Sequence, residues 1–346
     1  MDMLNSCSSN AILTKIRAIL GKRLTYADYA QMARKHDVGE VAALLKENPS
    51  YAIALRNIDE GNVHRGQLEQ LLKKDLFYKY SALRRYDFSG GSFYDFPIMQ
   101  REIDEIIRRI VLLQADENTD FVVDLPSYML GHTSFPLMDL ARTRNFEELL
   151  ECVAHTPYQR ILKGLGQKDI RSLNVMNCEH ALYSYYYKTL HEAIQKQFHG
   201  ETRQQLLEAA DSEIELQNIQ NIFRLKLYFH YDEARVRQYL YPYSHRYHKA
   251  QMDALIKAED FAQMLRVLTP EGQEEAEVLE EDGIEPYTNR LCYQLERKLL
   301  RFTTKAPVAM FTFLTLRRIE VQNIITVIEG VRYQMPQDEI LKMLIL

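Results

Sequence analysis

The hexapeptide IELQNI at Ile214 to Ile219 returns as IEVQNI at Ile319 to Ile324, with one conservative change in six residues. A Glu-x-Gln-Asn sequence set between isoleucines is not a low-complexity string that composition would often generate by chance. A weaker form, REIDEI at Arg101 to Ile106, keeps the glutamate and the isoleucines but has a glutamate in place of the asparagine. These three stretches predict an internal repeat.

The repeated hexapeptide supplies five candidate signature residues: Glu102, Glu215, Asn218, Glu320 and Asn323. Each Glu-x-x-Asn pair has the i, i+3 spacing that places both side chains on one face of a helix. We expect the carboxylate to pair with an arginine or lysine of a neighbouring helix and the asparagine to bond a loop backbone, because nothing nearby supplies further metal ligands. Arg224, Arg317 and Arg318 are possible partners for the glutamates.

A second pattern also occurs three times, in DVGEVAALLKENP from Asp37, NFEELLECVAHTP from Asn145 and DFAQMLRVLTP from Asp260. Each copy begins with a favoured N-cap residue and has Glu or Gln three positions later, as in a capping box. A short amphipathic stretch follows and ends at a proline, which favours the start of a new helix. The pattern predicts a helix, a tight turn and a second helix at three equivalent places.

Between the two patterns, each unit contains a longer stretch with apolar residues at three and four spacing around Glu69, Glu179 or Glu296, which predicts a helix with one core-facing side. The chain of 346 residues has only 13 glycines and 10 prolines, which favours helices over turn-rich sheets. We therefore predict an all-α protein built from three similar helical modules, at residues 1–120, 121–233 and 234–346.

Composition and charge exclude several classes of protein. A content of 46% hydrophobic and 26% charged residues is ordinary for a soluble domain. Uncharged runs fall short of the roughly 18 residues of a spanning helix, and the start MDMLNSCSSN lacks a basic n-region, so we expect neither a membrane span nor a secretory signal. The net charge of −5 and the acidic segment Glu271 to Glu285 argue against nucleic acid as a partner. Cys7, Cys152, Cys178 and Cys292 are far apart, which suggests reduced cysteines.

Motifs for catalysis and metal binding are weak. His36-Asp37 resembles the metal dyad of HD phosphohydrolases, but those enzymes need an earlier ligand histidine and His36 is the first histidine here. His245 and His248 are not part of an H-E-x-x-H motif, and the chain has no phosphate-binding loop, G-x-G-x-x-G or G-x-S-x-G. We predict no catalytic residue, no metal site and no cofactor.

From about Ala11 to Leu346 the chain resembles the C subunit of V/A-type rotary ATPases, called d in eukaryotes. The most specific part is the ending APVAMFTFLTLRRIEVQNIITVIEGVRYQMPQDEIL, in which Gly330 follows the Glu-x-x-Asn pair and Pro336 precedes Glu339-Ile340. The resemblance implies three all-α modules arranged with pseudo-threefold symmetry into a funnel. Its wide mouth would receive the central shaft, and its narrow face would sit on the cytoplasmic loops of the membrane rotor ring.

This resemblance implies a non-catalytic central-stalk subunit, one copy per complex, that transmits torque for proton or sodium transport. It would be cytoplasmic and peripheral on the cytoplasmic face of the membrane. A generic all-α repeat scaffold for protein–protein interaction is the alternative, although solenoids have shorter, open-ended repeats. An all-α hydrolase is a third reading, and the missing ligand set counts against it.

Overall fold

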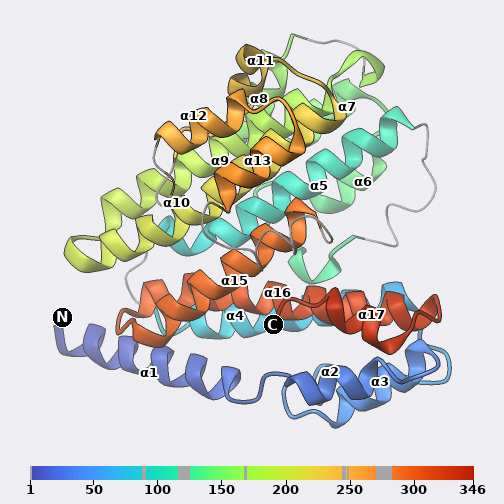
Figure 1. Ribbon diagram of the computed structural model, residues 1–346. Helices are drawn as coiled ribbons and strands as arrows, with labels where there is room; N and C mark the ends of the chain where they lie inside the picture. The colour runs from blue at the N-terminus through green and yellow to red at the C-terminus, as the bar shows by residue number, and fades with distance from the viewer. Residues whose placement is uncertain are drawn as a thin grey trace. The chain divides into compact units, whose positions relative to one another are not determined.

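The computed structural model describes residues 2–87, 91–115, 125–166, 170–243, 247, 249–269 and 283–346, with side chains from residue 8 onward. All regular elements within these ranges are helices, as the sequence predicts (Figure 1). The chain divides into two compact units, which we call the split unit (Met1–Ser89 with His199–Leu346) and the inserted unit (Gly90–Phe198). The predicted module boundaries after residues 120 and 233 stay a prediction.

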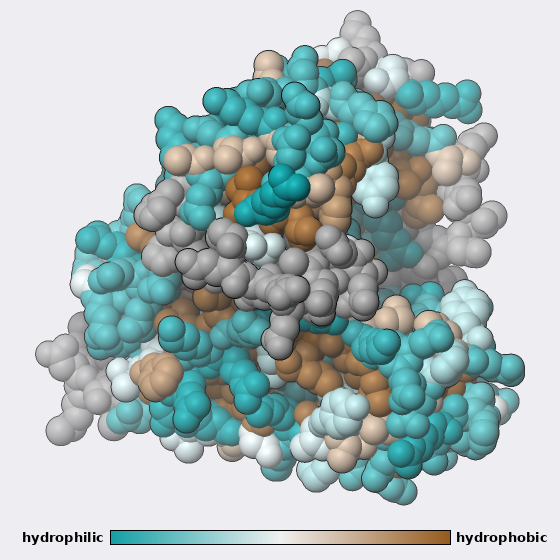
Figure 2. All heavy atoms as spheres, viewed as in Figure 1, coloured by the Kyte–Doolittle hydropathy of each residue, from teal (hydrophilic) through white to brown (hydrophobic). Residues whose placement is uncertain are grey.

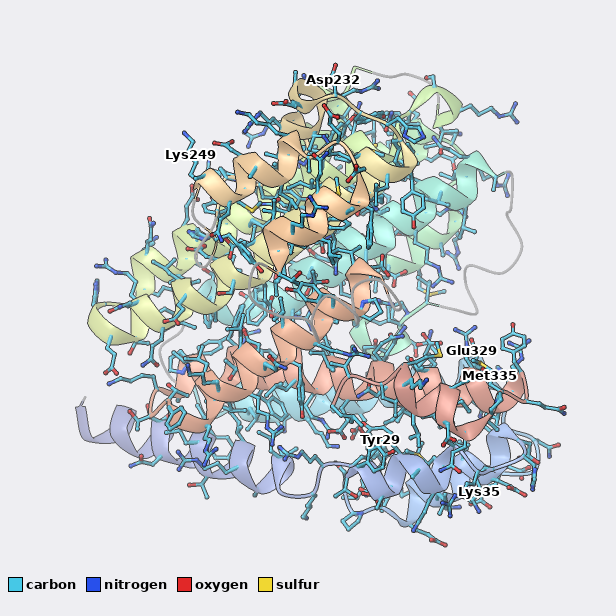
Figure 3. The ribbon with its side chains drawn as sticks, viewed as in Figure 1. Tyr29, Lys35, Asp232, Lys249, Glu329 and Met335 are labelled. Atoms are coloured by element: carbon cyan, nitrogen blue, oxygen red, sulfur yellow. The ribbon has the colours of Figure 1, made fainter. Side chains whose placement is uncertain are left out.

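The split unit contains helices from both ends of the chain. Its helices are α1 (Asp2–Leu20), α2 (Tyr26–Met32), α3 (Val38–Glu47), α4 (Arg65–Arg84), α10 (Gly200–Phe223), the π-helical turn η4 (Arg224–Tyr228), α11 (Glu233–Gln238), α12 (Lys249–Lys257), α13 (Phe261–Leu268), α15 (Ile284–Phe302), α16 (Ala306–Arg332) and α17 (Gln337–Lys342). One apolar core joins α2, α3 and α4 to the second half of α16 and to α17. Figure 3 shows Tyr29 of α2 turned toward α16, and this ring is only 2% exposed.

The inserted unit is continuous in sequence. Its helices are the 3₁₀ turn η1 (Ser92–Asp95), α5 (Phe96–Gln114), the 3₁₀ turn η2 (Ser127–Met129), α6 (Leu137–Arg142), α7 (Phe146–Cys152), α8 (Pro157–Gly164), the 3₁₀ turn η3 (Ile170–Ser172) and α9 (Val175–Gln197). Ile103, Ile106 and Ile110 recur at three and four spacing along α5 and are fully buried, as an amphipathic helix requires. This stripe of α5 packs against α9.

Each of the three predicted N-caps begins a helix in the structure. The side chains of Asp37, Asn145 and Asp260 accept hydrogen bonds from the backbone N–H three residues later, at 2.8, 2.9 and 2.8 Å. The Glu or Gln at that third position reaches back to the N–H of the residue before the cap, at 3.2, 2.7 and 3.1 Å. The caps of α3, α7 and α13 therefore share one geometry. The Glu or Gln side chain accepts from the N–H of the residue before the cap, whereas the capping box predicts a bond from the N–H of the cap residue itself.

The prediction of a helix after each proline is correct once and wrong once. Pro157 starts α8, but the residues after Pro49 form a series of turns through residue 57. The carbonyl of Ser50 accepts a 2.7 Å hydrogen bond from Nζ of Lys79, and the N–H of Ser50 donates to the side chain of Asn48. A regular helix would pair the Ser50 carbonyl with a later backbone N–H, whereas the bond from the N–H of Ser50 to Asn48 is one that an N-cap also makes. Pro270 lies outside the described residues.

The six helices that carry the repeated glutamates pair in a regular order. We call α5, α10 and α16 the signature helices because they carry Glu102, Glu215 and Glu320, and the helices with Glu69, Glu179 and Glu296 are α4, α9 and α15. Within the inserted unit, α5 packs on α9; within the split unit, α10 packs on α15, and α16 packs on both α4 and α15. Each signature helix thus packs on the long helix of the following sequence copy, and the last one packs on the first.

The chain reverses sharply after α16. Gln334 takes a left-handed conformation with φ 55°, the N–H of Met335 donates to the carbonyl of Gly330 at 2.9 Å, and the N–H of Gln334 donates to that of Val331 at 3.0 Å. These two bonds form a Schellman motif, which satisfies the carbonyls at the helix end. Helix α17 then packs back on α16, with Ile340 over Gly330.

Hydrophilic side chains cover most of the face shown in Figure 2, with hydrophobic groups exposed in small areas between them. In the part of the chain that the structure describes, no helix is both long enough and apolar enough to span a bilayer. Cys152, Cys178 and Cys292 carry no disulfide.

Candidate functional site

Glu320 of α16 anchors a buried polar cluster in the split unit. Its Oε1 accepts a hydrogen bond from the hydroxyl of Tyr51 at 2.7 Å and another from Nη1 of Arg317 at 2.7 Å. Tyr51 and Arg317 are 0% and 1% exposed. Burial and the carboxylate of Glu320 raise the pKa of Tyr51 well above its ordinary value, against the opposing effect of Arg317. Tyr51 therefore stays protonated and donates to the carboxylate.

Arg317 extends this cluster to α4. Its Nη2 lies 3.9 Å from Oδ2 of Asp75, which also pairs with Lys79, and its guanidinium stacks 5.1 Å from the ring centroid of Tyr51. Burial lowers the pKa of Arg317, but the carboxylates of Glu320 and Asp75 raise it by more, so the net shift is upward. The pKa of Lys79 is lowered by its burial and by Arg317. The cluster is a paired structural network in which each carboxylate has a cationic partner.

Glu102 has the same role in the inserted unit. Its Oε2 accepts a 2.6 Å hydrogen bond from the hydroxyl of Tyr158, and its Oε1 accepts from the backbone N–H of Ser134. The side chain of Glu102 is 4% exposed. Burial, followed by the charge of Glu102, raises the pKa of Tyr158, which keeps the hydroxyl protonated. Tyr158 is one residue after Pro157 and Tyr51 is two residues after Pro49, so a tyrosine close to the end of the second sequence pattern bonds the glutamate in both cases.

Glu215 of α10 bonds a backbone group. Its Oε1 accepts a 2.8 Å hydrogen bond from the N–H of Tyr247, and the side chain is 1% exposed. The glutamate of each signature helix therefore accepts a hydrogen bond from another copy of the repeat. Glu102 and Glu215 accept from the copy that follows, and Glu320 accepts from the first copy.

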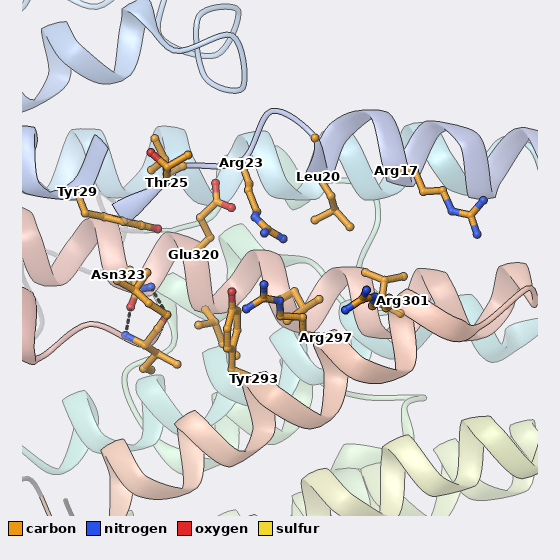
Figure 4. A pocket seen from close by; sticks show the side chains of 17 residues that line it. Arg17, Leu20, Arg23, Thr25, Tyr29, Tyr293, Arg297, Arg301, Glu320 and Asn323 are labelled. Atoms are coloured by element: carbon orange, nitrogen blue, oxygen red, sulfur yellow. Dashed lines mark hydrogen bonds between the residues drawn. The ribbon is translucent and has the colours of Figure 1, made fainter. Parts of the chain in front are cut away.

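Both signature asparagines make a two-bond contact with one distant backbone residue. Asn218 donates from Nδ2 to the carbonyl of Tyr241 and accepts from its N–H, both at 2.9 Å. Asn323 makes the same pair of bonds to Ile345, at 2.7 and 3.0 Å (Figure 4). The partners lie 23 and 22 residues further along the chain. Each asparagine thus pairs both polar groups of a backbone residue that is removed from water.

The prediction that asparagine would bond a loop backbone is confirmed, and Arg317, one of the three arginines expected as partners, pairs with Glu320. Arg317 belongs to α16 itself, however, and not to a neighbouring helix as predicted, while Glu102 bonds a tyrosine and a backbone N–H. A helix-periodic sequence can show which side a carboxylate faces, but not that a tyrosine 269 residues away will reach it. In the first copy, Glu105 takes the place of asparagine and pairs with Arg101 at 2.7 Å.

The other proposed arginine partners bond their own helices. Arg224 contacts the side chain of Asn221 at 3.4 Å, and Arg318 contacts Thr315 at 3.3 Å. His36 donates its backbone N–H to Glu40, while Asp37 caps α3. His245, His248 and most of the acidic segment Glu271 to Glu285 lie outside the described residues. Among the residues whose side chains are described, no three His, Cys, Asp or Glu side chains gather where they could hold a metal.

A cavity of about 690 Å³ opens in the split unit between α1, the α1–α2 connection, α15 and α16. We call it the arginine cavity, because Arg17, Arg23, Arg297 and Arg301 line it (Figure 4). Figure 4 shows Arg17 and Arg23 on the side of α1, and Arg297 and Arg301 on α15 across from them. Leu20, Leu24, Leu300, Leu316, Ile319, Tyr29 and Tyr293 supply apolar surface.

The guanidinium groups of the four arginines in the cavity have no hydrogen-bond or ion-pair partner among the described residues. Arg297 lies over the ring of Tyr293, with 5.9 Å from its Cζ to the ring centroid. Glu320 also lines the cavity, but Arg317 and Tyr51 already bond it. This group of arginines was not predicted from the sequence. The i, i+4 spacing of Arg297 and Arg301 shows that both lie on one face of a helix. The sequence around them does not indicate that α1 and its connection bring two more arginines to the same place.

Similarity to known proteins identifies the family of this chain. Curated proteins gave no significant match to this chain. A family model described as ATP synthase (C/AC39) subunit matches residues 12–343, nearly the whole chain and both units of the structure. The all-helical fold, the paired signature helices and this match lead to one conclusion: the chain belongs to the ATP synthase (C/AC39) subunit family.

Proposed function

We propose that this protein is the non-catalytic central-stalk subunit of a V/A-type rotary ATPase. It joins the central shaft to the membrane rotor ring and transmits torque for proton or sodium transport. The family match is the observation that carries the proposal. The subunit acts as one copy per complex, on the cytoplasmic face of the membrane.

A part that transmits torque needs a stiff body, and the signature contacts supply stiffness. Glu102, Glu215 and Glu320 each bond a segment distant in sequence, and Asn218 and Asn323 each clamp a backbone residue. Buried, fully paired polar groups of this kind resist local opening because breaking them leaves unpaired groups away from water. Within the split unit, α16 of the last copy packs on α4 of the first, which ties the two ends of the chain into one body.

The test is removal of the subunit from an otherwise complete, membrane-reconstituted complex. ATP hydrolysis by the soluble head should continue, while ATP-driven ion transport should be lost, because shaft and ring are no longer joined. Adding the purified protein back should restore transport. Docking through exposed ion pairs, each contributing about 0 to 1 kcal/mol, should also weaken as salt is raised.

Normal pumping by complexes without the subunit would refute the coupling role. Loss of hydrolysis by the head would instead indicate a role in assembly. A generic scaffold would bind a partner without making transport depend on it, so restored transport on adding the protein back separates the two functions.

A further inference from the structure

We propose that the arginine cavity binds a ligand that carries two or more phosphate groups next to an apolar part. The first observation is the convergence of four guanidinium groups on one space of about 690 Å³, a volume in the range typical of small-molecule sites. They come from separate parts of the chain, Arg17 and Arg23 from α1 and its connection, and Arg297 and Arg301 from α15 (Figure 4).

The second observation is the missing counter-charge. The whole chain has a net charge of −5, yet the four arginines of this cavity have no carboxylate partner among the described residues. Glu320 is the acidic side chain in the cavity lining, and Arg317 compensates its charge. Like charges at i, i+4, as in Arg297 and Arg301, destabilise a helix slightly, and two more positive charges face them. An anion bound between them would remove this repulsion.

The chemistry of the lining selects the ligand. Guanidinium groups hold phosphate oxygens through paired N–H donors, and several phosphates are needed to engage both sides of the cavity. Leu20, Leu300 and Ile319, with the ring of Tyr293, offer a surface for hydrocarbon beside the charges. Either a phosphorylated lipid headgroup or a soluble polyphosphate has this phosphate chemistry, and the lipid also supplies the apolar part.

The experiment measures binding of two probes to the full-length protein: inorganic tripolyphosphate by calorimetry, and phosphatidylcholine vesicles with or without a phosphatidylinositol phosphate by co-sedimentation. The test variant is Arg23→Gln with Arg297→Gln, which removes one arginine from each side. The matched control is Lys22→Gln with Lys298→Gln, which removes two positive charges from adjacent, exposed positions outside the cavity. A second pair, Arg17→Gln with Arg301→Gln, tests the remaining arginines.

Saturable binding of either probe by the wild type is expected, with affinity reduced about tenfold for each arginine removed and changed less than about twofold in the lysine control. Binding of tripolyphosphate identifies a soluble ligand as sufficient, whereas binding to the phosphoinositide vesicles alone identifies a lipid. The proposal is overturned if neither probe binds saturably, or if the lysine control loses as much affinity as the arginine variants. Thermal unfolding of all variants shows whether they are folded.

Discussion

The hydroxyl of Tyr51 donates a 2.7 Å hydrogen bond to Glu320, although 269 residues separate the two in sequence. Tyr158 and Glu102 repeat this bond at 2.6 Å within the inserted unit. In both cases the tyrosine follows a proline that ends the capped helix pattern, and the glutamate belongs to a signature helix. The two sequence patterns are therefore linked by one recurring contact.

Removing the hydroxyl should destabilise each unit by a similar amount. Tyr51→Phe and Tyr158→Phe each take a donor from a buried carboxylate, which should cost about 1.5 to 3 kcal/mol. Chemical denaturation followed by circular dichroism measures the loss, and Tyr26→Phe, at a ring that is 62% exposed, is the control. A cost below about 0.5 kcal/mol for both buried tyrosines would show that these bonds do not stabilise the fold.

The asparagine clamp makes a local prediction. Asn323→Ala leaves both the N–H and the carbonyl of Ile345 without their partner, so the segment after α17 should open and the protein should lose about 2 to 4 kcal/mol. Amide hydrogen exchange at Ile345 should accelerate strongly. Asn289→Ala, at an exposed position of α15, is the matched control and should change neither quantity. Unchanged exchange at Ile345 would contradict the clamp.

Gly330 permits the close approach of α17 to α16. A Cβ at this position would lie 2.5 Å from Cγ1 of Ile340, a side chain that is 1% exposed and cannot move aside freely. Gly330→Ala should therefore destabilise by about 1 to 3 kcal/mol, even though alanine favours helices. In an Ile340→Ala background the clash is absent, and the same change should become neutral or stabilising by up to about 1 kcal/mol. A double-mutant cycle with additive effects would contradict this account.

The raised pKa of Glu296 leads to a prediction of how the free energy of unfolding changes with pH. Burial, then the charges of Glu213 and Glu208, raise the pKa of Glu296 well above its ordinary value of 4.5, against the opposing effect of Arg318. Above pH 4.5 the unfolded chain loses this proton while the folded protein keeps it, so the free energy of unfolding contributed by this group falls as pH rises toward the folded pKa.

Glu296→Gln removes this difference in protonation between the folded and the unfolded chain. The stability of the variant relative to wild type should rise with pH above 4.5, by up to about 1.4 kcal/mol per pH unit, until the folded pKa is reached. Denaturation curves at a series of pH values measure the difference, with the exposed residue Glu285 changed to Gln as control. A difference that stays constant with pH would mean that Glu296 is ionised in the folded protein.

Features that depend on neighbouring residues could be predicted from the sequence alone. The N-caps Asp37, Asn145 and Asp260 and the core-facing side of the helix around Glu69 are confirmed, because capping and helix periodicity involve residues three or four positions apart. The repeated hexapeptides identified the signature helices and led to the correct family, since a repeat is visible without knowledge of the fold.

Contacts between distant segments were decided only by tertiary structure. Pro49 is followed by turns because Lys79 of α4 takes the carbonyl of Ser50, and this could not be inferred from the residues next to the proline. Arg317 bonds Glu320 within one helix while Tyr51 reaches it from another. Arg23 and Arg297 meet across a cavity because α1 and α15 lie on either side of it. Local propensity acts over a few residues, whereas packing sets which distant side chains share a site.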